Sequence, residues 1–250
     1  MKFYIIHISY ARGANDSSKR KVIKVMIRSQ KVDLFCIQET KIQSMTKGLV
    51  RSLASGRFLD WGAMGAQGAA GGILICWDKR TLEVLEMEMG QFSISCRLRN
   101  VEDGNAWIFT GVYGSFSKED REILWEELGA IRGIWDDPSC LGGDLNVTLS
   151  QREMSNRGRL IGAMRRFAQV VDELEFLDLP MQGGVFSWSE GRNNQSWAKL
   201  DQFLVTQNWL DHFSGVVQSR LPKPTSDHFP ILLKGGGLRR GPSLFRFENM

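Results

Sequence analysis

Short apolar runs recur along the chain and are separated by polar or glycine-containing segments. The runs at 3–9 (FYIIHIS) and 32–40 (VDLFCIQET) predict buried strands, because they are rich in β-branched residues and too short for buried helices. Four more runs, GGILICW, LEVLEME, FSISCRL and AWIFTGVYG, predict consecutive strands between residues 71 and 114. Further strands are predicted at 139–147 (SCLGGDLNV), 184–189 (GVFSWS), 196–206 (SWAKLDQFLVT) and 226–234 (SDHFPILLK).

Three segments show helical periodicity instead. Residues 19–30 follow the capping residues Asp16, Ser17 and Ser18, and their apolar face is predicted to consist of Val22, Val25 and Met26. Residues 118–135 follow Ser117 as an N-cap. The third helix, at 160–176, carries one apolar stripe made of Leu160, Met164, Phe167, Val171 and Leu174. This order of strands and helices predicts two packed sheets with helices outside, and not a doubly wound parallel sheet.

Composition adds bounds on the class of protein. The chain has 250 residues, of which 42% are hydrophobic and 24% charged, as expected for one folded domain. We expect that domain to span residues 1–234 and to be followed by a Gly/Arg-rich linker and a truncated tail at 235–250. The net charge of +4 is compatible with a polyanionic partner but does not demand one. No apolar run reaches the roughly 20 residues of a membrane span, so we expect no membrane partner.

The four cysteines are Cys36, Cys76, Cys96 and Cys140. Each lies in or beside an apolar run, and no two have CxxC spacing, which argues against zinc and against a disulfide framework. Buried free thiols in a reducing, intracellular compartment are the better interpretation.

Polar side chains suited to a metal ion or a phosphate stand at the ends of several predicted strands. They are Glu39, Tyr113, Asp144, Asn146, Asp201 and the pair Asp227–His228. Carboxylates that meet at one edge repel one another unless a cation lies among them, and hard oxygen ligands suit Mg²⁺ or Mn²⁺. A histidine held by an aspartate can contact a phosphate or transfer a proton. Within SCLGGDLNV, Asp144 and Asn146 would face the same side of a strand. The pattern predicts hydrolysis of a phosphodiester or phosphomonoester.

Each residue also has an ordinary structural explanation. Glu39 taken alone is a loop carboxylate, Tyr113 a half-buried packing residue, and Asp201 a solvent-facing strand residue. Asp227–His228 before Phe229–Pro230 could form a simple turn. The functional interpretation depends on their joint occurrence at successive strand ends. His7 and His212 have no acidic neighbours and are assigned packing or surface roles.

The blocks IQET, GVYG, GGDLNV, KLDQF and SDHFPI occur in the order typical of one superfamily. Through them the chain resembles the endonuclease/exonuclease/phosphatase superfamily, the fold shared by deoxyribonuclease I and the apurinic/apyrimidinic endonucleases. The intervening segments most resemble the endonuclease domains of plant LINE-type (non-LTR) retrotransposons. The resemblance covers about residues 2–234 and implies an α/β four-layer α/β/β/α sandwich of two mixed β-sheets flanked by helices.

The resemblance implies a role for each block. Glu39 would be the principal Mg²⁺ ligand, with Asp227 assisting the metal site. Tyr113 would hydrogen-bond the scissile phosphate, and Asp144 would position or deprotonate the attacking water beside Asn146. His228 would contact the phosphate and be oriented by Asp201. Ser187 and Ser226 would be secondary phosphate contacts.

One position departs from the superfamily pattern. Counting back from Arg12–Gly13, an expected asparagine is replaced by Tyr10, whose side chain cannot supply a carboxamide to a metal or water shell. The resemblance therefore implies an intact fold with weakened catalysis. Three functions are left open: a metal-dependent endonuclease that nicks duplex DNA, a catalytically dead DNA-binding relic, and a phosphomonoesterase of the same fold.

Partners and location follow from the same resemblance. It implies DNA as the partner, a monomeric, nuclear protein, and a former fusion to a downstream reverse transcriptase. Phosphate contacts would supply most of the affinity. The candidate contacts near motif loops are Arg12, Lys41, Arg192 and Asn193, for which solvated loop residues are an equal alternative.

Overall fold

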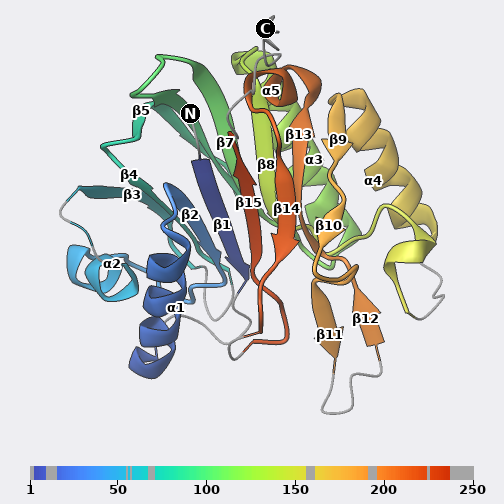
Figure 1. Ribbon diagram of the computed structural model, residues 1–250. Helices are drawn as coiled ribbons and strands as arrows, with labels where there is room; N and C mark the ends of the chain where they lie inside the picture. The colour runs from blue at the N-terminus through green and yellow to red at the C-terminus, as the bar shows by residue number, and fades with distance from the viewer. Residues whose placement is uncertain are drawn as a thin grey trace, which may run out of the picture.

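The computed structural model describes residues 3–9, 16–54, 56, 58–66, 71–155, 161–190, 196–223 and 226–236. Two β-sheets pack face to face, and helices cover both outer surfaces (Figure 1). The predicted four-layer α/β/β/α sandwich is therefore confirmed. None of the helices in these ranges combines the length and apolar character that a bilayer crossing requires.

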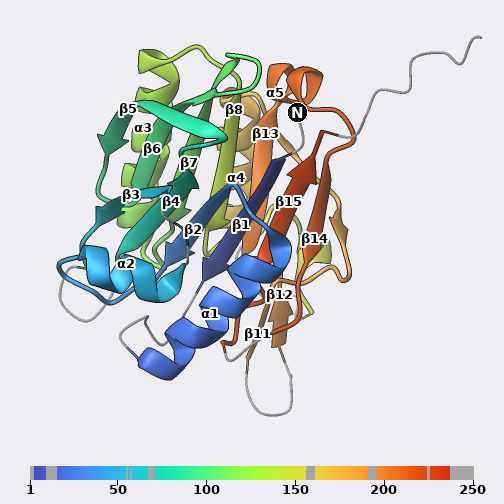
Figure 2. The same ribbon diagram turned by 60° about the vertical axis from the view of Figure 1, so that its left-hand side comes forward.

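The first sheet has seven strands in the order β10-β14-β15-β1-β2-β4-β3. Its strands are β1 (Phe3–Ser9), β2 (Leu34–Gln38), β3 (Leu59–Met64), β4 (Ile73–Asp78), β10 (Met181–Gln182), β14 (Val217–Arg220) and β15 (Ile231–Gly235). β1 runs parallel to β2 and antiparallel to β15. The helices α1 (Ser17–Gln30) and α2 (Lys47–Leu53) cover its outer face (Figure 2).

The second sheet has six strands in the order β5-β6-β7-β8-β13-β9. They are β5 (Leu82–Met89), β6 (Ser93–Asn100), β7 (Ala106–Tyr113), β8 (Ser139–Asp144), β9 (Phe176–Asp178) and β13 (Asp201–Thr206). The helices α3 (Lys118–Ile134) and α4 (Ile161–Glu173) pack on it, joined by stacked Trp125 and Phe167 rings 5.2 Å apart. The short elements are η1 (Gln151–Glu153), α5 (Gln207–His212) and the separate hairpin β11 (Trp188–Glu190) with β12 (Ser196–Ala198).

The main core lies between the two sheets, and alternation along the strands fills it. In β2, Leu34 and Cys36 face the other sheet, whereas Phe35 and Ile37 face α1 and α2. This double burial explains why the sequence shows a continuous apolar run and no polar alternation. The four cysteines are buried and free, as predicted.

The helix at 19–30 is present, but only Met26 of its predicted face packs on the sheet, whereas Val22 and Val25 are exposed. Asp16 is the N-cap, and its side chain accepts a hydrogen bond from the Ser18 N–H at 2.8 Å. The buried residues are Ile23 and Ile27, whereas Val25 is 68% exposed. Because Ile23 and Ile27 are four residues apart, they lie on one side of the helix and fix the orientation. In α4 the predicted residues Met164 and Phe167 are buried, and Leu160 lies outside the described residues.

Three predicted strands have different bounds in the structure, and the one expected at 184–189 is present only as β11 (Trp188–Glu190). The strand expected at 196–206 is divided into β12 and β13, because Ser187 Oγ accepts hydrogen bonds from the Leu200 and Asp201 N–H groups at 2.9 and 2.7 Å. The strand expected at 226–234 begins only at Ile231, so residues 226–230 form a loop. β15 ends at Gly235, and residues 237–250 lie outside the described ranges.

Candidate functional site

Strand register brings three predicted side chains into one row at the edge of the second sheet. Tyr113 ends β7 and pairs with Asp144, which ends β8. Asp144 also pairs with Asp201, the first residue of β13. Neighbouring strands lie about 5 Å apart, so paired residues from three strands are necessarily neighbours. Residues far apart in sequence thus meet for the reason that the strand-end pattern predicted.

The two glycines before Asp144 serve close packing. A Cβ at Gly142 would lie 2.5 Å from the Phe203 ring, and one at Gly143 would lie 2.1 Å from the Val112 carbonyl oxygen. The absence of side chains lets the first sheet approach, and Gln38 Oε1 accepts a hydrogen bond from the Asp144 N–H at 3.0 Å. Gln38 is fully buried and belongs to β2, so this bond crosses from one sheet to the other.

A buried Asp–His–Asp cluster forms the centre of the site. His228 Nδ1 lies 2.7 Å from Asp201 Oδ2, which is a hydrogen bond. His228 Nε2 lies 3.8 Å from Asp144 Oδ2, too far for a direct hydrogen bond. Ligand atoms of the three residues all lie within 4.8 Å of one another, and all three residues are buried.

Burial and charge shift the pKa values of this cluster. Burial lowers the pKa of His228, but the carboxylates of Asp201, Asp144 and Asp227 outweigh burial and raise this pKa to about 9. The imidazole is therefore a cation at neutral pH. Burial and the Asp201 carboxylate raise the pKa of Asp144 to about 7, against the opposing charge of His228. A carboxylate with a pKa near neutrality is suited to accept a proton from water.

A second pair, Glu39 with Tyr113, lies beside the cluster. The Tyr113 hydroxyl donates a hydrogen bond to Glu39 Oε1. Burial and this bond to Glu39 raise the pKa of Tyr113 far above its usual range, so the phenol stays protonated. Glu39 has φ +49°, a left-handed conformation that is uncommon outside glycine and often marks functional sites. Its other oxygen, Oε2, is buried and has no hydrogen-bond partner among the described residues.

Asn146 does not share a strand with Asp144, contrary to the geometry expected from their spacing. β8 ends at Asp144, whose Oδ1 accepts a hydrogen bond from the Asn146 N–H at 3.0 Å, and Asn146 has φ +50°. The chain turns there, and the Asn146 side-chain amide donates to the Gly114 carbonyl at 2.5 Å. Asn146 therefore links the β8 loop to the segment after Tyr113.

The sequence matches the Endonuclease/Exonuclease/phosphatase family over residues 9–228, which is most of the chain. The chain belongs to this family. Members of the endonuclease/exonuclease/phosphatase family are metal-dependent phosphoesterases, and the buried Asp–His–Asp cluster agrees with that chemistry. A search of curated protein sequences gives no significant match.

Solved structures of other family members share the fold at low identity. The AP endonuclease LMAP from Leishmania major is 14% identical with a TM-score of 0.73, and the match covers 94% of this chain and 87% of that one. The endonuclease domain of TRAS1, a telomere-specific non-LTR retrotransposon, is 16% identical with a TM-score of 0.68, covering 94% and 98%. A mannosyl-6-phosphatase from Bacteroides thetaiotaomicron is 15% identical with a TM-score of 0.65, covering 94% and 100%. These similarities establish the fold and leave the substrate open.

The donor set fits the divalent metal ion that the family implies. Glu39 Oε2 is a buried carboxylate oxygen that lacks a partner, and such an atom is costly unless a cation or donor reaches it. Asp144, Asp201 and His228 form the compact cluster of ionisable groups, from which Glu39 and Asp227 are absent. Glu39 still influences Asp144 electrostatically, since its charge is among the causes that raise the Asp144 pKa. Oxygen donors of this kind suit Mg²⁺ or Mn²⁺.

The remaining predicted contacts lie at different depths. Ser187 is fully buried and supports the start of β13, so its hydroxyl lies beneath the cluster and has no exposed surface. Ser226 Oγ accepts from the His228 N–H at 3.2 Å and donates to Asp227 Oδ1 at 3.2 Å. Asp227 is exposed, and its carbonyl accepts from the Ser189 N–H of β11. Lys41 is half-buried and follows β2.

Four residues named from the sequence lie outside the described ranges. They are Tyr10, Arg12, Arg192 and Asn193.

Sequence reasoning missed a buried cation that supports the site. Lys199 is 4% exposed, and its Nζ lies 2.6 Å from Asp178 Oδ1 and 3.2 Å from Glu153 Oε1. Glu153 also accepts hydrogen bonds from the backbone of the loop that follows Asn146. The network therefore fixes that loop against the strand that carries Asp201. A charged residue two positions before Asp201 was the available signal.

Proposed function

We propose that this chain is a Mg²⁺-dependent endonuclease that nicks duplex DNA and derives from a non-LTR retrotransposon. The observation that carries the proposal is the pairing of His228 with Asp201 and of Glu39 with Tyr113 at the same edge of the sandwich. Each pair joins a loop at the edge of the first sheet to a strand of the second sheet, and Asp144 lies between Tyr113 and Asp201 in that second sheet.

DNA is preferred as the substrate for three reasons. The net charge is +4, and the cations Arg220 and Lys223 lie over the Phe229 ring, next in sequence to His228. The β11–β12 hairpin projects from the end of the sandwich where the His228 loop lies, and Trp188 forms a β-bridge with His228 (Figure 1). Proteins of this fold that are named endonucleases include a retrotransposon domain. Contacts between such cations and DNA phosphates give an affinity for DNA that falls as the salt concentration rises.

The chain's own groups divide the chemistry. Asp144, with a pKa of about 7, accepts a proton from the attacking water. His228 is an imidazolium whose Nδ1–H is held by Asp201, so its Nε2–H is available to a non-bridging phosphate oxygen. The Tyr113 hydroxyl, whose single proton is donated to Glu39 here, would be a second and neutral donor to the phosphate when a metal ion engages Glu39. The water oxygen bonds to phosphorus and the P–O3′ bond breaks, so the products are a 5′-phosphate and a 3′-hydroxyl, whose oxygen takes its proton from solvent water.

A divalent cation held by Glu39, with Asp227 as an assisting ligand, would neutralise phosphate charge and stabilise the leaving oxygen. Asn146 holds the phosphate or the metal shell from the opposite loop. Ser226 and Arg12 are proposed as additional phosphate contacts, and Ser187 acts through the position of Asp201. Tyr10, in place of an asparagine, is proposed to weaken activity by roughly 10²–10³ in rate.

The test is nicking of supercoiled plasmid by the full chain, with Mg²⁺ and with a chelator. Conversion to the open circle that requires Mg²⁺ and is lost in Asp144→Ala is expected. Equal nicking by both proteins would remove the assignment. If neither nicks and Tyr10→Asn gains activity, the chain is a DNA-binding relic. Turnover of inositol or sugar phosphates in place of plasmid would identify a phosphomonoesterase.

The cellular setting follows from the proposed substrate. We infer a nuclear, monomeric protein that was once joined to a reverse transcriptase. Localisation of a tagged chain tests the nuclear location, and the mass of the chain in solution tests the monomeric state.

A further inference from the structure

The helices α1 and α2, which cover the first sheet, carry a concentrated positive charge. Together they contain seven lysine and arginine residues and no acidic residue. The whole chain has a net charge of only +4, so the rest of the chain is net negative. On the opposite side of the sandwich, α3 contains five acidic and three basic residues, and α4 contains two of each. The positive charge is therefore gathered on one outer layer of the molecule.

Five of these basic residues form one surface across the two helices. Lys21 and Arg28 on α1 are exposed, as are Lys47 and Arg51 on α2, and Lys24 is half-buried. The spacing of Lys21, Lys24 and Arg28 places them along one side of α1. Lys24 Nζ donates a hydrogen bond to the Arg51 carbonyl at 2.9 Å and so links α1 to α2, which lie side by side in Figure 2. We refer to these five residues as the basic surface.

The basic surface has no acidic partners of its own. On other elements, Arg80, Arg97, Arg99 and Arg166 each have a nitrogen within 3.0 Å of a carboxylate oxygen. By contrast, no residue of the basic surface forms an ion pair with another residue of the described ranges. Like charges three or four positions apart on a helix repel one another. A polyanion that lies along the surface would remove this repulsion.

The basic surface fits a sugar–phosphate backbone better than a lipid surface. The exposed apolar residues of α1 are only Val22 and Val25, whereas helices that lie in a membrane interface present Trp, Phe or Leu. Along α1, Lys21 and Arg28 are separated by about 10 Å, and one strand of a duplex carries a phosphate about every 3.4 Å along its axis. The three cations of α1 therefore match the spacing of about three successive phosphates.

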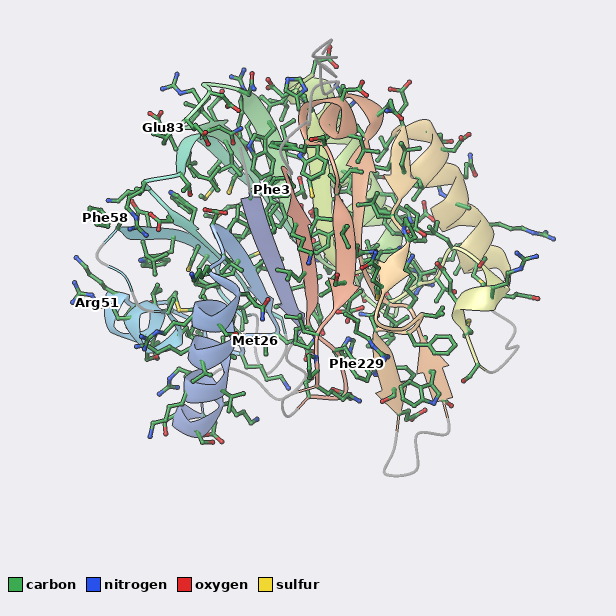
Figure 3. The ribbon with its side chains drawn as sticks, viewed as in Figure 1. Phe3, Met26, Arg51, Phe58, Glu83 and Phe229 are labelled. Atoms are coloured by element: carbon green, nitrogen blue, oxygen red, sulfur yellow. The ribbon has the colours of Figure 1, made fainter. Side chains whose placement is uncertain are left out.

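The basic surface leads away from the proposed cleavage site. β1 and β2 are parallel and end together at the edge that Glu39 follows, and α1 connects them. α1 therefore runs back from that edge along the outer face of the sheet. Figure 3 shows Arg51 well apart from Phe229, the residue after His228. A nucleic acid on the basic surface is thus a different segment from one that lies over the Asp–His–Asp cluster.

We propose that the basic surface binds the sugar–phosphate backbone of a nucleic acid segment outside the cleavage site. This backbone has two possible sources: duplex DNA that extends past the active-site edge, and a strand of RNA. Phosphate contacts position a protein on a nucleic acid without reading its sequence, so the surface holds the chain on its polyanion. The proposal uses no catalytic residue and does not depend on the proposed nuclease activity.

The test is the salt dependence of binding, measured by fluorescence anisotropy with the full chain in EDTA. The probes are a labelled DNA duplex of about 30 base pairs and a labelled oligouridylate of the same length, at about 50 to 200 mM KCl. The logarithm of the association constant falls with the logarithm of the salt concentration, with a slope of about −0.9 per phosphate contacted in a duplex and about −0.7 in a single strand. The triple variant Lys21→Gln/Arg28→Gln/Arg51→Gln should reduce the slope by about 2.7 for the duplex or by about 2.1 for the RNA. The probe whose slope changes identifies the source of the backbone.

A second triple variant serves as the matched control. Arg99→Gln/Arg165→Gln/Lys234→Gln replaces exposed residues outside α1 and α2. Each triple variant removes three positive charges, so any general loss of attraction for a polyanion is the same in both. The control should keep the wild-type slope. Glutamine favours a helix about as well as lysine and arginine do, so the α1–α2 variant should unfold at the wild-type urea concentration.

An unchanged slope for both probes in the α1–α2 variant would overturn the proposal, as would an equal reduction in the control. Vesicles of phosphatidylserine and phosphatidylcholine that bind through the basic surface, with no effect on either nucleic acid, would assign the surface to a membrane and also overturn it. Plasmid nicking with an unchanged slope would refute the basic surface and leave the nuclease assignment standing. A slope that depends on the basic surface, without nicking, would retain the surface and refute the nuclease assignment.

Discussion

Replacing Asp201 by asparagine isolates the charge that holds His228 as a cation. The carboxylate is fully buried and 2.7 Å from His228 Nδ1, and its charge is the largest of the causes that raise the His228 pKa. Asparagine keeps the size of the side chain and removes the charge. Burial then acts against fewer negative charges, so the His228 pKa should fall well below about 9.

The corresponding stability effect has a definite sign and pH range. The difference between about 9 in the folded chain and 6.5 in free histidine corresponds to about 3 kcal/mol of unfolding free energy. Because the folded pKa is the higher one, this contribution is complete below pH 6.5 and is lost as pH rises through 9. The pKa of Asp144 is also raised, from 3.8 to about 7, so its stabilisation is lost mainly between those values. Loss of stability between pH 7 and 9 therefore reports chiefly His228.

Two measurements check this. NMR titration of the imidazole C–H signals, with His228→Gln for assignment, gives the pKa in each protein. Urea unfolding at pH 7 and pH 9 should show a decline of about 2 kcal/mol in the wild type and a much smaller one in Asp201→Asn. The buried cysteines have raised pKa values and favour unfolding above about pH 9, but equally in both proteins. An unchanged His228 titration in Asp201→Asn would refute the reasoning.

Three further results are expected. Lys199→Met removes the buried cation between Asp178 and Glu153 and should lower the unfolding free energy in urea by about 3 kcal/mol; an unchanged midpoint would contradict the network. Mg²⁺ at about 100 times its dissociation constant should stabilise the wild type by about 2.7 kcal/mol in thermal unfolding. Glu39→Gln should lose most of this stabilisation. An equal stabilisation of both proteins would exclude Glu39 as the metal ligand. Ser117→Ala removes the hydroxyl that accepts the Asp120 N–H at 3.0 Å and should cost about 1 kcal/mol without changing nicking.

The arrangement of the site was predictable where strand register decides it. Tyr113, Asp144 and Asp201 stand at strand ends, and pairing of neighbouring strands places such ends side by side. The apolar runs located most of the central strands, since burial leaves a readable signal, whereas the short or less buried strands β3, β9, β10 and β14 were not predicted. The helix after Ser117 was likewise marked by its own capping residue.

The sequence predicted less where tertiary contacts override local pattern. Asn146 leaves the strand because the Asp144 side chain accepts its N–H, a local bond that spacing alone does not reveal. Val25 faces solvent because Ile23 and Ile27 fix the rotation of α1 against the sheet. The Glu127 carboxylate accepts a hydrogen bond from the Phe92 N–H, 35 residues away in the chain, so no short motif indicates this contact.

Three hydrogen bonds at the site join the first sheet, or the loops at its edge, to the second sheet: Asp144 to Gln38, Tyr113 to Glu39, and His228 to Asp201. Either sheet formed alone would carry only the donor or only the acceptor of each of these hydrogen bonds. During refolding, hydrolytic competence should then return in a single kinetic phase, when the halves dock, and a docking intermediate should show strand content without turnover. Mild heating that separates the two sheets at this edge should abolish the proposed nicking at a lower temperature than that at which the secondary structure is lost.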